Sequence, residues 1–473
     1  MIYLHVPFCG SFCTYCDFYS EICRSAQAFN EYADAVIAEI RGRHEELSMN
    51  MSARDAVNTL YIGGGTPSVL PLDVLARIVK ALSSSCALRQ AQRPTVGVSE
   101  KISVSDAAVA EPVPLAAEPV PLAAEPVPLA AEPVPLAAEP VPLAAEPVPL
   151  AAGPVPLVAE PLSSVFDQVH SVAEPVVRHG SPTFEATSPF EEFTVEVNPE
   201  DIVEKGPEYV RGLIALGVNR VSMGVQSFDD GILRWMNRRH DARRAVEAFR
   251  ILRGCGVRNI SIDLIFGLSQ LTDETWIGTI EKALSFAPEH ISAYQLSIEE
   301  GSALARMVAD GRYVEASDEQ CRRQYDVLRR CLRQSGYHHY EISNFAKPGF
   351  EAVHNSAYWR RVPYIGLGPG AHSLTGNVRS WNSQELPHMT SDGSLMTYSR
   401  NSETLSPEDI RVERIMLSLR TDKGLEATEL YSLADRSVID ALLSEGALEL
   451  RDTRIRIPED HLFTSDEIIR ELI

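Results

Sequence analysis

Three cysteines near the start of the chain have the spacing expected of ligands to an iron–sulfur cluster. Cys9, Cys13 and Cys16 follow one another as C-x3-C-x2-C within one short loop. Three thiolates from such a loop can bind three irons of a cubane [4Fe-4S] cluster, which leaves the fourth iron free to bind a substrate. The alternative is a zinc site, which needs a fourth ligand in tetrahedral geometry. His5 is the only near candidate, and it lies on a predicted strand with its side chain directed away.

The elements that must position this loop alternate between strands and helices. The pattern predicts strands at Ile2–Val6, Thr59–Ile62, Phe193–Val197, Arg220–Val225, Ile260–Phe266 and His290–Leu296. Helical patterns include Ala28–Leu47, Leu72–Leu82, Ile202–Leu216, Ala242–Cys255 and Glu274–Phe286. Repeated strand–helix units imply a parallel sheet with right-handed crossovers. Six such units predict an α/β fold built on a partial (β/α)6 barrel.

Polar residues and glycines interrupt these strand patterns at the carboxyl ends. The first strand leads into the cysteine loop, and the second leads into a glycine run from Gly63 to Pro67. The next three end with Glu196, Gln226 and Asp263. The carboxyl ends of parallel strands meet at the face where barrel proteins carry their active sites. Glycines let backbone approach a ligand closely, and the three polar side chains can bind an amino group, ribose hydroxyls or an adenine edge.

Composition limits the classes of protein to which the chain can belong. The 473 residues are 45% hydrophobic, which allows a full core, and the net charge of −22 argues against a nucleic-acid surface. The other five cysteines are scattered, and free thiols indicate a reducing compartment. The sequence shows no export leader and no apolar run long enough to cross a membrane. We therefore expect a cytoplasmic protein without a transmembrane segment.

A segment of abnormal composition interrupts the chain from about residue 86 to residue 189. The unit Glu-Pro-Val-Pro-Leu-Ala-Ala repeats from Glu111 through Ala152. Two prolines in each unit forbid a continuous helix and hence a coiled coil. We predict a disordered, polyproline-II-like insert in a surface loop on the face opposite the chemistry. A docking arm for a partner is the alternative interpretation.

The cysteine loop and the strand ends together resemble a known family. Tyr15 fits the aromatic position of the radical S-adenosylmethionine (radical-SAM) loop. Nearly the whole chain outside the insert resembles the oxygen-independent coproporphyrinogen III oxidases and their relatives, the HemW-type haem chaperones. Five motifs carry the resemblance: residues 5–9 (HVPFC), 63–68 (GGGTPS), 196–199 (EVNP), 222–228 (SMGVQSF) and 263–268 (DLIFGL).

The resemblance implies a set of residues that contact SAM, bound through the open iron of the cluster. By motif these are Tyr3, Gly64, Gly65, Thr66, Glu196, Gln226 and Asp263. Arg238 fits the family's SAM-contacting arginine, although the adjacent Arg239 leaves the register there less secure.

Three features favour the chaperone branch over the oxidase branch. The oxidases have a fourth cysteine two residues after the third, where this chain has Phe18, and they have a longer segment before the cluster. Residues 354–359 match the H-N-x-x-Y-W motif typical of HemW-like proteins. His354 is then a predicted haem ligand, since an imidazole can ligate haem iron. The alternatives are a core histidine held by its neighbours and core aromatics at Tyr358 and Trp359.

The resemblance and the motifs together predict a haem chaperone that binds a [4Fe-4S] cluster, SAM and haem, without coproporphyrinogen oxidase activity. The expected partners are haem and haem-acceptor proteins, with membrane-bound respiratory enzymes among the candidates, and no nucleic acid. The alternative function is radical decarboxylation of coproporphyrinogen III to protoporphyrinogen IX.

The remaining segments complete the predicted domain organisation. We expect the barrel over residues 1–305, a connecting region over 306–400 and a small α+β winged-helix-like domain over 401–473. Within the connecting region, the glycine-rich residues 366–371 indicate close backbone packing, and His372 is a second candidate ligand. Ser406 and Pro407 form a helix start, and residues 448–457 form a hairpin pattern.

Overall fold

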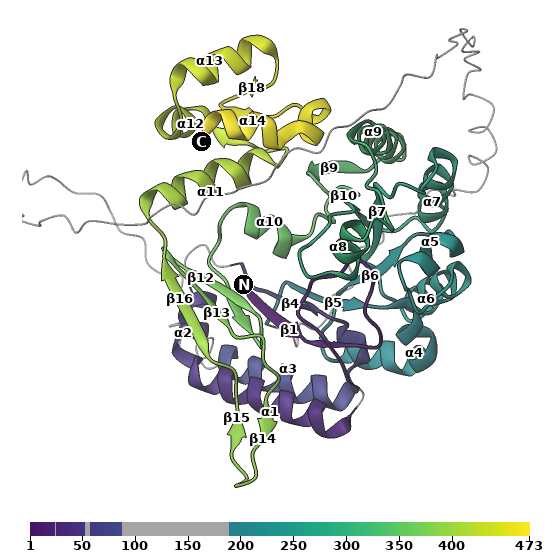
Figure 1. Ribbon diagram of the computed structural model, residues 1–473. Helices are drawn as coiled ribbons and strands as arrows, with labels where there is room; N and C mark the ends of the chain where they lie inside the picture. The colour runs from purple at the N-terminus through teal and green to yellow at the C-terminus, as the bar shows by residue number, and fades with distance from the viewer. Residues whose placement is uncertain (24, 53–56, 88–188) are drawn as a thin grey trace, which may run out of the picture. The chain divides into compact units, whose positions relative to one another are not determined.

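A nine-stranded sheet forms the centre of the computed structural model, which describes residues 1–23, 25–52, 57–87 and 189–473 (Figure 1). Its strand order is β11-β1-β4-β5-β6-β7-β8-β10-β9. The six strands from β1 to β8 in this order are mutually parallel, which confirms the predicted partial barrel. The predicted disordered insert lies outside the described residues, apart from its two ends.

The observed strands of this sheet match the predicted ones to within a few residues. Their bounds are β1 Ile2–Val6, β4 Thr59–Gly64, β5 Glu192–Val197, β6 Arg220–Gln226, β7 Ile260–Phe266, β8 His290–Gln295, β9 His338–Glu341, β10 Asn344–Ala346 and β11 Ile365–Leu367. Strand β11 pairs in parallel with β1, whereas β10 pairs antiparallel to β8, so both edges carry strands that the sequence pattern missed.

Helices between the strands cover the outer face of the sheet. They are α1 Ala26–Gly42, α2 His44–Ser52, α3 Leu72–Ala87, α4 Pro199–Ala215, α5 Asp230–Trp235, α6 Ala242–Gly254, α7 Asp273–Ser285, α8 Ala303–Ala309 and α9 Asp318–Gln334, with a 3-10 turn at Pro67–Val69. Helix α1 packs against α3, α4 against α6, and α7 against α9 (Figure 1). These contacts enclose the apolar core between helices and strands.

Strand side chains alternate between this apolar core and a polar interior. In β6 the outward residues Val221, Met223 and Val225 are fully buried, whereas Arg220, Ser222 and Gly224 have the opposite parity. Strand β5 alternates in the same way. Because successive side chains of a strand point to opposite faces, the inner face of the barrel is lined by polar groups and glycines rather than by the packed aliphatic layers of a complete barrel.

The predicted helix over Ala28–Leu47 is observed as two helices, which corrects that prediction. Arg43 leaves the helical conformation between α1 and α2, with φ −104° and ψ 19°. Its guanidinium binds Glu39 and Glu46 on the two helices, and the break lets it reach the carbonyl of Gly366 at 2.6 Å. The helix therefore ends where a buried side chain gains partners on a distant segment.

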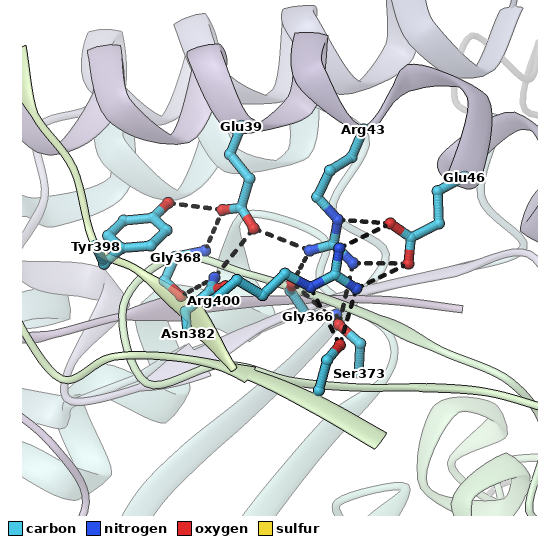
Figure 2. A network of polar contacts seen from close by, with 10 residues as sticks. Glu39, Arg43, Glu46, Gly366, Gly368, Ser373, Asn382, Tyr398 and Arg400 are labelled. Atoms are coloured by element: carbon cyan, nitrogen blue, oxygen red, sulfur yellow. Dashed lines mark hydrogen bonds and ion pairs between the residues drawn. The ribbon is translucent and has the colours of Figure 1, made fainter. Parts of the chain in front are cut away.

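Arg43 belongs to a polar network that joins α1 and α2 to the segment after β11 (Figure 2). Glu39 accepts hydrogen bonds from Arg43 (2.9 Å), the Gly368 amide (2.9 Å), Asn382 (3.0 Å) and Tyr398 (2.6 Å). The carboxylate thus has four donors, which compensates for its burial.

The network fixes the strands that follow the glycine-rich loop. These are β12 His372–Thr375, β13 Val378–Asn382 and β16 Arg400–Thr404, which form a three-stranded antiparallel sheet. A hairpin of β14 His388–Met389 and β15 Leu395–Met396 extends between β13 and β16. The predicted close backbone packing is present, since a Cβ on Gly366 would lie 2.0 Å from the carbonyl oxygen of His372.

The C-terminal segment folds as helices around a small sheet. It contains α11 Pro407–Leu419, α12 Ala427–Leu433, α13 Arg436–Glu445 and α14 Ser465–Leu472, a 3-10 helix at Glu459–Thr464, and strands β17 Leu425–Glu426, β18 Glu449–Arg451 and β19 Arg454–Arg456. Ser406 caps α11 in a capping box with Asp409, and β18 and β19 form the predicted hairpin. The division of residues 306–473 into two domains stays a prediction.

Among the described helices, none is both long and apolar enough to cross a membrane.

We predict that Arg43→Met destabilises the protein by roughly 3 kcal/mol, because it removes the cation of the largely buried Glu39 and one of the two cations of Glu46, which keeps Arg400. Arg77→Met is the matched control, since Arg77 forms an exposed ion pair with Asp34 and should cost less than about 1 kcal/mol. Urea unfolding of both variants checks the difference. Equal, small effects would show that the network does not stabilise the fold.

Candidate functional site

A cavity of about 640 Å³ opens where the parallel strands end. Ten of the predicted site residues line it: Cys9, Cys13, Cys16, Gly64, Gly65, Thr66, Glu196, Gln226, Arg238 and Asp263. They come from the cysteine loop, from the ends of four strands and, for Arg238, from the segment between α5 and α6. The arrangement therefore brings the thiols and the strand-end polar groups into one enclosure.

The cysteine loop is held against the barrel by backbone contacts. The loop begins at strand β2 (Phe8–Cys9) and ends at strand β3 (Glu21–Ile22), and these two strands pair in parallel. At its centre, Thr14 donates from its amide to Met236 (3.1 Å) and from its hydroxyl to Trp235 (2.8 Å). The loop is thus positioned by the segment that also carries Arg238.

The three thiols line the cavity, and two of them have polar partners there. Cys9 Sγ lies 3.4 Å from Thr66 Oγ1, and Arg238 donates to Cys13 Sγ at 3.2 Å. Within the described ranges, no three Cys, His, Asp or Glu side chains converge as one metal ion requires. Cysteines that ligate a cubane surround it more widely than the ligands of one ion do, since each binds a different iron. His5 is not the missing zinc ligand, because its nitrogens contact Tyr19 O (2.8 Å) and Tyr3 OH (3.0 Å).

Burial raises the pKa of the Cys9 thiol and raises that of Cys16 to about 12. Metal ligation requires thiolates, so binding would release these protons. Gly65 leaves room beside the sulfurs, since a Cβ there would lie 3.1 Å from Cys9 Sγ and 2.7 Å from the Phe8 carbonyl oxygen.

The two adjacent arginines have different roles in the structure. Arg238 donates to Cys13 and to the Gly224 carbonyl (2.6 Å), so its guanidinium lies inside the cavity. Arg239 is paired with Asp201 at 2.8 Å. Both arginines line the cavity, and Arg238 is the one that contacts a thiol; its contact with SAM stays a prediction.

Glu196 is a buried carboxylate with two donors. Its oxygens accept from Tyr61 OH (2.7 Å) and from the Gly64 amide (3.2 Å). Burial raises the pKa of Glu196 to about 7, and the Tyr61 hydrogen bond opposes this rise. The group is therefore poised to change its charge near neutral pH.

A backbone irregularity places Gln226 in the cavity. The register between β6 and β7 shifts between Gly224 and Gln226, and Gln226 has a positive φ of 68°. Positive φ is uncommon for a residue other than glycine, and a bulge re-aims the side chain that follows it. A Cβ on Gly224 would lie 2.9 Å from Gln226 Nε2, so the glycine is needed to admit the amide.

The carboxylate of Asp263 accepts hydrogen bonds from serine hydroxyls, and the charge of the buried Arg220 acts on it. Ser222 and Ser261 each lie 3.1 Å from its carboxylate, and burial raises its pKa. Arg220 is 1% exposed, and its Nε and Nη1 have no hydrogen-bond partner among the described residues. Glu192 and Asp263 are the two carboxylates whose charges act on it. Arg220 thus supplies the positive charge inside a polar enclosure.

Two predicted site residues do not line the cavity. Tyr3 lies behind its wall, where its ring is 6.2 Å from the ring of Tyr61 and its hydroxyl contacts His5. His354 lies on α10 Val353–Trp359 and is 1% exposed. Its Nδ1 is 2.7 Å from Thr59 Oγ1 and its Nε2 is 3.1 Å from Tyr358 OH.

The partners of α10 place His354 at the amino ends of β4 and β5, where its ring lies 5.2 Å from that of the cavity residue Tyr61 and the adjacent Asn355 lines the cavity. The amides of Val353 and His354 donate to Glu192, the first residue of β5, at 2.8 and 2.9 Å. Thr59 is likewise the first residue of β4, whereas Gly64 and Thr66 near Cys9 lie at its far end. Five strand steps separate the two ends by about 16 Å. Burial lowers the pKa of His354 to about 3, so it is neutral.

Several cavity residues were not predicted from the sequence. Tyr61, Ser222 and Ser292 are inward-facing strand residues, and Tyr294 and Gln295 end the sixth strand. The alternation within each strand was the signal that could have found the first three. The same strand-end rule that selected Asp263 would have found the last two.

Comparisons with known proteins agree with this geometry. A model of the radical SAM superfamily matches residues 170–283. The heme chaperone HemW of Mycobacterium tuberculosis (strain CDC 1551 / Oshkosh) is 25% identical over 476 aligned residues, which cover 100% of this chain and 94% of that protein. The heme chaperone HemW of Bacillus subtilis (strain 168) is 34% identical over 256 residues, which cover 53% of this chain and 66% of that protein.

Among solved structures, the radical-SAM coproporphyrinogen III oxidase HemN of Escherichia coli has a similar fold, with a TM-score of 0.62 and 18% identity. The similarity covers 99% of this chain and 89% of that chain. The fold is therefore that of a radical-SAM protein. Within that superfamily, the chain belongs to the HemW-type family.

Because of Glu196, the stability of the apo protein should depend on pH. The pKa of Glu196 is about 7 in the folded protein, whereas that of an ordinary glutamate is 4.5. Between these two pH values the folded protein therefore binds more protons than the unfolded chain. The free energy of unfolding should therefore fall as pH rises through this range, by at most roughly 1.4 kcal/mol per pH unit. Glu196→Gln should remove that contribution, which urea unfolding at several pH values measures as a difference from wild type.

The control for Glu196 is Tyr61→Phe, which removes a hydrogen bond that favours the carboxylate and should raise the pKa further. A carboxyl group that titrates near pH 4.5 in wild type would contradict the buried, desolvated Glu196 of this structure.

Proposed function

We propose that this protein is a haem chaperone that binds a [4Fe-4S] cluster, SAM and haem and delivers haem to acceptor proteins. The observation that carries the proposal is the similarity to a heme chaperone HemW over the whole chain. The three-thiol loop at a strand-end cavity supports the cofactor part of the proposal.

The residues around the cavity have separable roles in this proposal. Cys9, Cys13 and Cys16 would bind three irons, and Arg238 would donate a hydrogen bond to the Cys13 sulfur. When bound, the cluster supplies an open iron for SAM and a source of one electron. The glycines of residues 63–65 leave space at the strand ends.

SAM carries an amino group, ribose hydroxyls and an adenine, and the cavity offers polar groups for each. Glu196 and Asp263 supply carboxylate acceptors, and Gln226 supplies an amide that both donates and accepts. We propose these three, with Gly64, Gly65, Thr66 and Arg238, as the SAM-binding residues. Tyr3 would act on SAM indirectly, through the neighbouring ring of Tyr61, or directly if SAM moves that ring aside.

Phe18 is the feature of this cavity that favours the chaperone over the oxidase. It lines the cavity mouth and is 65% exposed, at the position where the oxidases have a fourth cysteine. A phenyl ring cannot ligate iron, so this chain lacks that ligand. The fold similarity to HemN keeps coproporphyrinogen III oxidation as the alternative function.

His354 stays a predicted haem ligand, and the structure sets a condition on it. Both ring nitrogens have hydroxyl partners, so ligation requires Tyr358 to release Nε2. We further propose a cytoplasmic location, because free thiols persist in a reducing compartment. Membrane-bound respiratory enzymes are candidate acceptors, and we propose no nucleic-acid partner.

We predict that replacing Cys9, Cys13 or Cys16 with Ala abolishes the broad absorbance near ~400 nm after anaerobic reconstitution, because each change removes an iron ligand. Cys255→Ala is the matched control, since Cys255 lies outside the cavity and its thiol contacts Pro207. A wild-type preparation that takes up zinc but no iron would contradict the cluster assignment.

Haem titration and anaerobic coproporphyrinogen III turnover on the same reconstituted sample test the function. We expect a Soret band that saturates at one haem per chain and no SAM-dependent decarboxylation. Transfer to an apo-haem protein, followed by the shift of that band, should be faster than release into buffer. Decarboxylation by a sample that binds no haem would establish the oxidase instead.

A further inference from the structure

A buried acid outside the proposed SAM-binding set joins two segments of the site. Asp201 lies in the first turn of α4 and is 4% exposed. One of its carboxylate oxygens accepts from Arg239 at 2.8 Å, and the other accepts from the hydroxyl of Ser68, also at 2.8 Å. Arg239 follows α5, and Ser68 follows the glycine run, so one carboxylate holds two segments that are far apart in the sequence.

Arg239 reaches the cysteine loop at Gly10, between the first two thiols. A Cβ on Gly10 would lie 2.7 Å from Cζ of Arg239 and 3.0 Å from its Nε, so the guanidinium packs directly against the glycine. The guanidinium cannot move aside cheaply, because it would lose the largely buried carboxylate of Asp201. Gly10 therefore provides the space in which Arg239 supports the loop.

The same acid fixes the glycine run and the end of β5. Ser68 is fully buried, and its hydroxyl also accepts from the amide of Asn198 at 3.0 Å. Asn198 caps α4 and lies two residues after Glu196. The residues just before Ser68 include Gly64, Gly65 and Thr66 of the proposed SAM site. Asp201 thus holds three parts of the site relative to one another.

Other contacts attach the centre of the loop to residues 235–239. Asn237, with a positive φ of 57°, donates to the Phe12 carbonyl at 2.7 Å. Thr14 also contacts this segment, as described above. The loop therefore moves with residues 235–239, and the ion pair of Arg239 with Asp201 connects that segment to α4 and to the glycine run.

We propose that Asp201 is a positioning residue for SAM binding, because through Arg239 and Ser68 it sets the cysteine loop relative to the strand ends. The inference rests on the proposed cluster and SAM sites, and it assigns no contact with SAM to Asp201. A ligand held by both the thiol loop and the strand ends senses their separation, so a shift of about 1 Å should weaken its binding even when all three thiols still bind iron.

Asp201→Asn tests the proposal, because the amide keeps the shape of the side chain and removes the charge that holds Arg239. In the anaerobically reconstituted full-length protein, the absorbance near ~400 nm should be retained. The SAM concentration that half-converts the electron paramagnetic resonance signal of the reduced cluster should rise by about tenfold.

Glu200→Gln is the matched control for Asp201→Asn. Glu200 is the neighbouring buried acid of α4, and it pairs with Arg244 on α6 rather than with the arginine that contacts Gly10. This variant should respond to SAM like wild type.

Alkylation of the apo protein measures the loop without any cofactor. Cys9 is 8% exposed, and in Asp201→Asn it should react about tenfold faster than in wild type, since loss of a buried partner favours local opening. Cys321, which is 2% exposed, is the internal control and should react at an unchanged rate, as mass spectrometry of the two peptides can show. Equal acceleration at both cysteines would report general destabilisation and overturn the positioning role.

Gly10→Ala perturbs the same contact from the side of the loop. The φ of Gly10 is not positive, so alanine fits the backbone and the expected conflict is with Arg239 alone. The variant should weaken the SAM response in the wild-type background and add little to the effect of Arg239→Ala, which removes the guanidinium. An Asp201→Asn variant that binds SAM like wild type would overturn the positioning role and leave the chaperone function standing. A wild-type cluster whose signal does not respond to SAM would overturn the proposed SAM site itself.

Discussion

The polar inner face of the parallel sheet is the constraint on which the rest of the structure depends. In β4, β5 and β6, every residue of inward parity from Thr59 to Gly224 is polar or glycine. A barrel lined in this way cannot close on an aliphatic core, so its charges must be balanced within it. The buried Arg220, on which the charges of Glu192 and Asp263 act, supplies that balance.

This constraint separates the two ends of the barrel. At one end, Glu192 accepts from the first turn of α10 and holds the H-N-x-x-Y-W helix in place. At the other end, Glu196, Asp263 and the bulge at Gln226 surround the thiol loop. The helix motif and the thiol loop are therefore linked through the interior, and Asn355 of the motif lines the same cavity as the thiols. The H-N-x-x-Y-W motif, which in sequence resembles a haem-binding site, therefore also holds α10 against the sheet in this fold.

The parts of the fold that follow from local pattern could be predicted, and those that depend on distant partners could not. Strand alternation located the six parallel strands, cysteine spacing and strand ends located nine cavity residues, and the family resemblance located Arg238. The break at Arg43 depends on a carbonyl 323 residues away, which no local helix pattern contains. The surroundings of His354 likewise require Thr59 and Glu192, which belong to two other strands. The bulge at Gln226 depends on the register with β7 and left no signal in the strand itself.

The central claim is that the three thiols hold a cluster whose open iron faces the strand-end polar groups. Electron paramagnetic resonance of the reduced, reconstituted protein with and without SAM tests it most directly, because SAM bound to a unique iron changes the g-values of the cluster. The account predicts a shifted signal with SAM in wild type and a weaker response in Asp263→Asn, with the cluster retained in both. A cluster signal that is identical with and without saturating SAM would contradict it.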